Sequence, residues 1–364
     1  MKLLKIKLFF AISSFFCMYA GTVYCQELNQ FRVLVKNKCS AIKDQGNSGT
    51  CWSFASISFI ESEIERVSNL DIDLSEWFIV RNIYPEKIRN YIRTEGNTFL
   101  SSGGQTQDVL WVIKHKGLMP EQMFPGPKKS GKFNSVRIDT SIIDFSESLR
   151  WNDKGLISSN WETQLDSILD SNLGKNPANF KYEQQIYNPI TFRDYLGIDI
   201  NDYIQITSFN HHDYYQPFSL ESKFNWSYSA YMNLPLEDFM VALDTALLNG
   251  YTVALNIDVT ENDFEFAFKS DTGIIKSDYQ FVDQNIRQNL FENGQTRVDH
   301  MMHIVGIEED NNKKRYYITK NSWGKIGALN GFLYISQEYI MSKAMSLTMH
   351  VNALPSNILD KINK

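Results

Sequence analysis

Cys51 lies in a segment whose residue types could perform nucleophilic chemistry. The segment KDQGNSGTCWSF, residues 43–54, places a glutamine, two glycines and two hydroxyl side chains before Cys51. From Trp52 the apolar residues recur at helical spacing to about Asn69, so the sequence predicts a helix that begins at Cys51. A helix N-terminus carries partial positive charge, which favours a thiolate over a thiol. Cys51 is therefore a candidate nucleophile.

A catalytic thiol needs a group that accepts its proton, and histidine is the usual one. Distance along the sequence excludes none of the six histidines as that partner. They are His115, His211, His212, His300, His303 and His350. The residues alone therefore leave the choice of base open.

The remaining cysteines point to neither a disulfide framework nor a metal site. Cys17 and Cys25 fall within the first 25 residues, so a mature chain would keep Cys39 and Cys51. Two cysteines make no disulfide framework. Without a nearby histidine pair they also cannot fill the four positions of a structural zinc site. We predict no metal and no organic cofactor, and we expect Cys39 to be inert.

The first 25 residues have the pattern of a secretory signal peptide. Three lysines within the first seven residues precede a mostly apolar run over residues 8–20, and VYC offers a cleavage site. The run is too short to span a bilayer comfortably, so we expect no stable membrane insertion after its removal. The bulky Tyr24 argues against a lipid anchor on Cys25. The sequence thus predicts a secreted or periplasmic protein.

Composition and periodicity predict a folded α+β protein. The 364 residues are 43% hydrophobic and 13% aromatic with a net charge of −6, which supports a packed core and argues against nucleic acid as a partner. Helical patterns dominate early and strand patterns late, which indicates two unlike lobes. The predicted helices cover about 52–69, 74–93, 107–115 and 236–247, and the predicted strands lie near 252–259, 303–309, 315–321 and 331–336.

Five short motifs follow one another along the chain. DQGNSGTCWSF contains Cys51, LSEWF and SSGGQ come next, DHMMHIVGI contains His300, and KNSWG contains Asn321. In this order they resemble the conserved segments of the papain-like cysteine peptidases. The resemblance covers about Lys43 to Val351 and is weakest in the middle third. It implies a two-lobe α+β fold, with a helical N-terminal lobe and an antiparallel, β-barrel-like C-terminal lobe.

The resemblance also assigns chemical roles. Cys51 would attack the scissile carbonyl, and His300 would take the thiol proton and later protonate the leaving amine. Asn321 would orient the imidazole. The side-chain amide of Gln45 and the backbone N–H of Cys51 would form the oxyanion hole.

Three further residues are implied to bind substrate. Gly103 and Gly104 would leave room for the substrate backbone, and Trp323 would shield the bond between His300 and Asn321 from water.

The spacing to Gly306 favours His300 over His303 as the base. Residues 300 and 303 would face opposite sides of a strand, so both cannot line one site equally. We expect His303 to be a partly buried strand residue. His211 and His212 are expected to be surface or lid residues rather than ligands.

Two departures from the papain pattern indicate a particular branch. Ser48 stands where papain and its lysosomal relatives carry a disulfide-forming cysteine. Cys51 and His300 are 249 residues apart, against about 130–150 in typical members, so roughly 100 residues are inserted. Both features resemble the bleomycin hydrolase and aminopeptidase C branch.

The expected organisation is a signal peptide over 1–25 and one peptidase domain over 26–364. Within that domain we predict a helical lobe over about 43–125, a helical insertion over about 126–234 and a β-rich lobe over about 235–364.

The branch resemblance implies an aminopeptidase that hydrolyses peptides through a Cys-His-Asn triad and a thioester acyl-enzyme. Branch members commonly form homo-oligomers, and they often place their own C-terminus in the cleft; this chain ends in LDKINK. One alternative is an endopeptidase or another acyl-transfer enzyme on the same triad. A second is a non-catalytic peptide-binding protein on the same scaffold.

Overall fold

The structure is a computed structural model of the chain. It describes residues 31–127, 134–150, 157–260, 264, 268–269 and 272–363. The predicted signal peptide therefore lies outside the described residues. Within these ranges, no helix combines the length and the apolar composition needed to cross a membrane.

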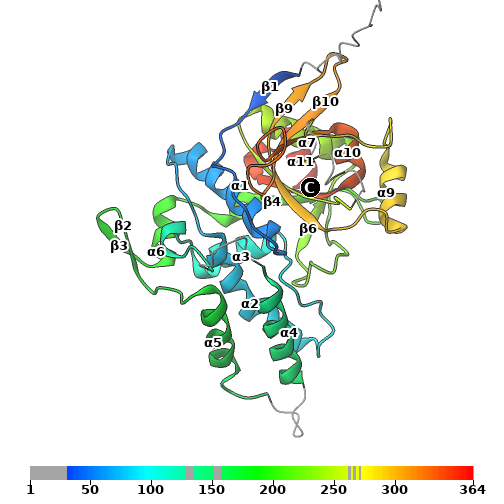
Figure 1. The fold of residues 1–364 in the computed structure, drawn as a ribbon. Helices are drawn as coiled ribbons and strands as arrows, with labels where there is room; N and C mark the ends of the chain where they lie inside the picture. The colour runs from blue at the N-terminus through cyan, green and yellow to red at the C-terminus, as the bar shows by residue number, and fades with distance from the viewer. Residues whose placement is uncertain are drawn as a thin grey trace, which may run out of the picture.

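Three helices build the lobe that carries Cys51 (Figure 1): α1 (Cys51–Ser68), α2 (Glu76–Arg93) and α3 (Thr106–Lys116). Every residue of α1 from Cys51 to Ile64 is buried, because α2 and α3 pack on one side of it and the sheet on the other. The helix ends at Asn69, which takes the left-handed conformation with φ 55°. These bounds match the predicted helices to within two residues.

The middle of the chain adds helices to this lobe. They are α4 (Val136–Arg150), α5 (Trp161–Leu173) and α6 (Pro189–Leu196), with a hairpin of β2 (Phe180–Tyr182) and β3 (Gln185–Tyr187). In Figure 1, α4 and α5 run side by side below α2. Their buried leucine, isoleucine and phenylalanine side chains join the core of the helical lobe.

The second lobe is built on a ten-stranded sheet in the order β5-β6-β4-β12-β7-β9-β10-β11-β8, with β1 paired to β9. Its strands are β1 (Arg32–Lys36), β4 (Tyr203–Thr207), β5 (Pro217–Ser219), β6 (Ala230–Asn233), β7 (Val253–Ile257), β8 (Ile274–Ile275), β9 (His300–Glu309), β10 (Arg315–Lys320), β11 (Phe332–Ser336) and β12 (Ala344–His350). Its helices are α7 (Leu236–Leu248), α9 (Gln284–Glu292), α10 (Gln337–Lys343) and α11 (Ser356–Ile362), and the 3₁₀ turns of the chain are η1 (Glu121–Met123), η2 (Ile200–Asp202) and η3 (Val351–Ala353).

The predicted two-lobe α+β fold is confirmed, with two refinements. Most neighbouring strands are antiparallel, but the described sheet is an open path from β5 to β8 rather than a closed barrel. In addition, β4, β5 and β6 come from the stretch expected to be a helical insertion, and they extend the sheet of the β-rich lobe.

Strand β9 separates the two hydrophobic cores. Met301 belongs to the core of the helical lobe, whereas Met302 and Ile304 belong to the core of the β-rich lobe. This division follows the alternation of side chains along a strand. Helix α1 packs directly against β9. Cys51 at the N-terminus of α1 lies within hydrogen-bond reach of the backbone of Met301, so this helix end lies near the first residues of β9.

Candidate active site

Cys51 occupies the first position of α1 and is 9% exposed. The loop before it is held by hydrogen bonds. The Ser48 hydroxyl donates to the carbonyl oxygen of Gln45 at 2.7 Å and lies 2.6 Å from the Thr50 hydroxyl. Ser48 stands where the papain pattern has a disulfide-forming cysteine. Cys39 and Cys51 are both free thiols.

His300 opens β9 and is 5% exposed. Its Nε2 lies 2.9 Å from Oδ1 of Asn321, and the same oxygen accepts the backbone N–H of Ser322 at 2.8 Å. A backbone N–H can only donate, so the Asn321 atom that it meets is the oxygen. His300 therefore carries its proton on Nε2, and Nδ1 keeps its lone pair.

Trp323 covers the imidazole. Its ring centroid lies 5.0 Å from that of His300, with the planes tilted by 38°. Phe268 meets the indole edge-on at 5.1 Å. Trp323 therefore packs against the imidazole of His300. It does not line the cavity that Cys51 and His300 share, so its role in substrate binding stays a prediction.

Cys51 and His300 line the same cavity, which has a volume of about 240 Å³. Both lobes and the inserted segment contribute to its wall. The lining residues are Gly49, Cys51, Phe99, Ser101, Ser102, Gly103, Gly104, Phe224, Val298, Asp299, His300 and Met301. The cavity thus brings Cys51, His300, Gly103 and Gly104 together.

Burial favours the neutral form of both reacting groups. It raises the pKa of the Cys51 thiol to about 11; the backbone N–H of Met301 lowers this pKa, while the charge of Asp299 raises it. Burial also lowers the pKa of His300 to about 4, against the hydrogen bond from Asn321, which raises it. The backbone amides at the helix N-terminus lower the pKa of Cys51, in the direction expected from the sequence, but loss of solvation raises it by more.

Gln45 lies next to the site but does not line the cavity. Its Nε2 donates to the carbonyl oxygen of Ser48 at 2.6 Å, and its Oε1 accepts from the Ser322 hydroxyl at 2.6 Å. The first bond lies within the loop before Cys51. The second connects this loop to Ser322, which directly follows Asn321, the residue that hydrogen-bonds to His300. One of the two Nε2 hydrogens faces Ser48.

The two glycines are needed by packing as well as by any substrate. A Cβ on Gly103 would lie 2.4 Å from the Phe224 ring. A Cβ on Gly104 would lie 2.5 Å from the Asp108 carboxylate and 2.9 Å from the Trp52 ring. Trp52 in turn donates from Nε1 to the carbonyl oxygen of Ser102 at 2.8 Å, which fixes this loop against α1.

His303 lies away from the cavity, on the side of β9 that faces α1. It is fully buried, and its Nδ1 is 2.8 Å from the Ser58 hydroxyl. Lys320 donates to that hydroxyl at 2.7 Å. His303 therefore belongs to a buried polar cluster between the lobes rather than to the group around Cys51.

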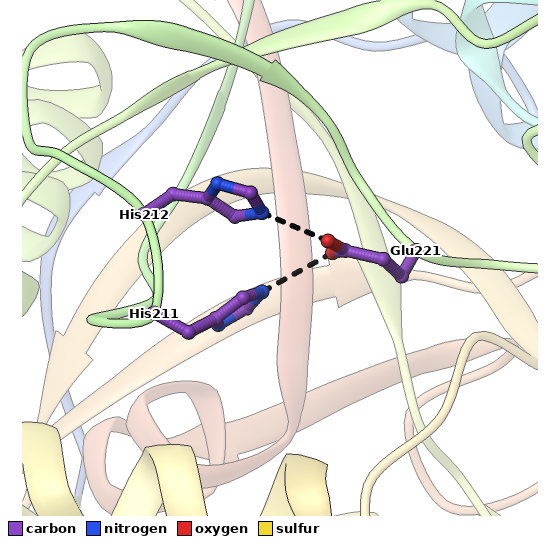
Figure 2. Close-up of side chains that lie close together, drawn as sticks. All are labelled: His211, His212 and Glu221. Carbon is purple, nitrogen blue, oxygen red and sulfur yellow. Dashed lines mark hydrogen bonds and ion pairs between the residues drawn. The ribbon is translucent and has the colours of Figure 1, made fainter.

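His211, His212 and Glu221 are the group that could hold a metal ion among the described residues (Figure 2). Nε2 of each histidine lies near one oxygen of Glu221, at 3.2 Å for His211 and 2.8 Å for His212. The three side chains are exposed, and their candidate ligand atoms lie within 4.8 Å of one another.

The hydrogen bonds around His211 oppose metal binding at this cluster. Gln288 accepts the backbone N–H of Asn210 with Oε1 at 2.8 Å, so its Nε2 must be the group that donates to Nδ1 of His211 at 2.8 Å. His211 then carries its proton on Nε2, the atom that faces Glu221. The arrangement fits a hydrogen-bonded clasp, because a metal ligand needs that lone pair.

Sequence reasoning did not single out eight of the twelve residues that line the cavity, among them Phe99, Phe224 and Asp299. Asp299 directly precedes His300, so its position next to the base was a usable signal. Phe224 lies in the weakly patterned middle of the chain, 76 residues before His300. Only tertiary packing brings it to the cavity.

The fold and this cavity define a two-lobe α+β protein of the papain-like class, with a buried cysteine and a buried histidine at the junction of the lobes. The chain belongs to the Peptidase C1-like family, whose family model matches residues 15–364. It is thus a cysteine-type peptidase, and the predicted resemblance is confirmed.

Curated relatives share low identity over most of their length. Aminopeptidase E of Lactobacillus helveticus is 22% identical over 85% of this chain and 80% of its own. Aminopeptidase C of Lactobacillus delbrueckii subsp. lactis is 23% identical over 87% of this chain and 81% of its own. Among solved structures, PepW from Lactobacillus rhamnosis HN001 aligns with a TM-score of 0.70 at 18% identity, covering 91% of this chain and 84% of that one.

Proposed function

We propose that the protein is an aminopeptidase that cleaves peptide bonds through Cys51, His300 and Asn321. The observation that supports this most is the shared cavity of Cys51 and His300, with His300 bonded to Asn321 on the ring nitrogen away from the proposed proton transfer. The aminopeptidase names of the relatives support the exopeptidase part of the proposal.

The reaction begins from a neutral thiol and a neutral imidazole. Nδ1 of His300 accepts the proton of Cys51 as the sulfur attacks the scissile carbonyl carbon, which gives a tetrahedral oxyanion. When the intermediate collapses, the C–N bond breaks and the imidazolium gives its proton to the leaving amine. Water, deprotonated by His300, then hydrolyses the thioester and restores both groups.

The oxyanion needs donors that are fixed before the reaction. The backbone N–H groups at the start of α1 point out of the helix end without intrahelical partners, so that of Cys51 is one candidate. The second is the Nε2 hydrogen of Gln45 that does not bond to Ser48. Removal of one such donor typically costs about 3 kcal/mol of transition-state stabilisation.

A pair of substitutions and a pair of substrates test the proposal. Cys51→Ala should abolish hydrolysis of an alanyl-coumarylamide reporter, while far-UV circular dichroism stays unchanged. Hydrolysis retained in Cys51→Ala would overturn the mechanism. Equal hydrolysis of free and N-acetylated peptides by the unmodified protein would leave a cysteine peptidase but remove the aminopeptidase restriction.

A non-catalytic peptide-binding protein is tested by alkylation of Cys51. In the proposed enzyme, iodoacetamide should modify Cys51 faster in the unmodified protein than in His300→Ala, because the imidazole takes the thiol proton. Equal rates in the two proteins would favour the inert scaffold.

A further inference from the structure

The cavity beside Cys51 is small for a peptide-binding cleft. Its volume of about 240 Å³ lies below the about 300–1,000 Å³ typical of sites for drug-sized ligands. An endopeptidase has to accommodate several residues on the acyl side of the scissile bond. The size alone therefore raises the question of what closes this space.

Phe224 closes it next to Gly103. Its ring occupies the position that a Cβ on Gly103 would need, 2.4 Å away. Phe99 meets Phe224 edge-on, with ring centroids 5.5 Å apart, and the Lys223 ammonium lies 4.7 Å and 5.1 Å from the two ring centroids. The pair of rings, Phe99 and Phe224, is called the aromatic wall below.

The segment that carries Phe224 is anchored to the helical lobe. Gln105 donates to the Ser222 hydroxyl at 3.4 Å, and Gln107 donates to Asn225 at 3.3 Å. Trp226 donates from Nε1 to the Asp108 carboxylate at 3.2 Å. These bonds hold residues 222–226 against the N-terminal turn of α3.

The clasp of Glu221 with His211 and His212 fixes the other side of the same segment (Figure 2). Asn225 is 4% exposed and donates to the carbonyl oxygens of Leu220 and Ser229 at 3.1 Å and 2.9 Å. Hydrogen bonds hold this segment on both sides, so Phe224 has a fixed position in the site.

The cavity also holds a carboxylate. Asp299 lies on its wall, and Oδ1 accepts the backbone N–H of Val259 at 2.9 Å. Oδ2 has no hydrogen-bond partner among the described residues. A substrate with a free N-terminus brings an ammonium group, for which a carboxylate is the complementary partner.

The last described residues, in α11, lie away from the cavity. Ile358 of α11 is fully buried in the core of the β-rich lobe, and Lys361 pairs with Asp238 of α7 at 2.9 Å. Within residues 302–363, as far as the structure describes them, no residue lines the cavity. Lys364 lies outside the described residues.

We infer that the cavity accepts a single N-terminal residue, with the aromatic wall blocking a longer acyl side and Asp299 receiving the α-ammonium group. The inference rests on the proposed function. It assigns exopeptidase specificity to the aromatic wall and to Asp299, which directly precedes β9, rather than to the described C-terminal residues.

Reporters of graded length test the aromatic wall. The unmodified protein should hydrolyse alanyl-coumarylamide at least about tenfold better in kcat/KM than alanyl-alanyl-coumarylamide or the N-acetyl-alanyl reporter. In Phe224→Ala the ratio for the longer reporters should rise about tenfold, since one blocking side chain has been removed. Ile186→Ala is the matched control, because Ile186 lies in the same insertion, is 78% exposed and does not line the cavity.

Phe99→Ala provides a second variant if Phe224→Ala fails to fold, because Phe99 is 45% exposed. It should change the ratio in the same direction. Unchanged ratios in a folded Phe224→Ala or Phe99→Ala protein would overturn the inference about the wall. Cys51→Ala is measured in parallel. If it loses all hydrolysis while the ratios stay unchanged, the proposed function stands and only the inference about the wall fails.

The role of Asp299 has its own readout. Asp299→Asn should raise KM about tenfold for the free alanyl reporter. It should leave KM of the N-acetylated reporter unchanged when both are measured in the Phe224→Ala background. An equal change for both reporters would contradict an ammonium site at Asp299.

Discussion

Replacement of Asn321 by alanine tests how much the imidazole depends on its hydrogen bond. The side-chain oxygen of Asn321 accepts from His300 at 2.9 Å and from the Ser322 N–H at 2.8 Å. A buried hydrogen bond contributes about 0.5–1.5 kcal/mol, and about 1.4 kcal/mol corresponds to a tenfold change in rate. We therefore expect kcat/KM of Asn321→Ala to fall about tenfold, with activity remaining because Cys51 and His300 are intact.

The same substitution should also lower stability. It leaves the Ser322 N–H without its acceptor in a buried environment, which costs about 1–3 kcal/mol. Urea unfolding measured by tryptophan fluorescence gives this change in the free energy of unfolding. Hydrolysis assays with the alanyl reporter should therefore be run well below the unfolding midpoint of the variant.

Asn321→Asp is the matched control. It keeps an acceptor for both bonds and adds a negative charge, which raises the pKa of His300. Since His300 must be neutral to accept the thiol proton, the acid limb of the pH profile should move to higher pH. A loss in Asn321→Ala as complete as in Cys51→Ala, or no loss at all, would refute the orienting role.

Two further predictions concern the cavity wall. Burial, with the charge of Asp258, raises the pKa of Asp299 to about 7, and ionised Asp299 disfavours the Cys51 thiolate. The positive charges of Lys343 and Arg297 oppose that rise. Asp299→Asn should therefore speed the alkylation of Cys51 by iodoacetamide above about pH 7 and have little effect below about pH 6, where Asp299 is protonated. Asp360→Asn, at an exposed position, is the control. Equal acceleration in that control would contradict the effect assigned to the charge of Asp299. Gly104→Ala should lower the free energy of unfolding by about 1–3 kcal/mol, because its Cβ would overlap the neighbouring carboxylate and indole; unchanged urea unfolding would contradict the described packing.

The parts of the site predicted from sequence are those set by local pattern. Apolar spacing placed the helix start at Cys51, and the order of short motifs selected His300 and Asn321 for one site. The sequence pattern that identifies each of these residues lies within a few positions of the residue itself. Helix bounds and strand positions were predictable for the same reason.

The parts that escaped prediction depend on packing between distant segments. Phe224 reaches Gly103 only because residues 222–226 bond to the start of α3. The upward shift in the pKa of Cys51 could not be predicted, because the helix end is visible in the sequence, whereas the burial that outweighs it is not. Strands β4–β6 fall in the stretch expected to be a helical insertion, since strands of three to five residues carry little periodicity.

The hydroxyl of Ser48 determines how the loop before Cys51 responds to reductants. Since hydrogen bonds rather than a sulfur–sulfur bond hold the loop before Cys51, reductants that keep the thiol competent leave that loop unaltered. Oxidation of Cys51 to a sulfenic acid or a mixed disulfide would block the proposed nucleophile. A thiol reductant would reverse that change while the hydrogen bonds of the loop stay in place.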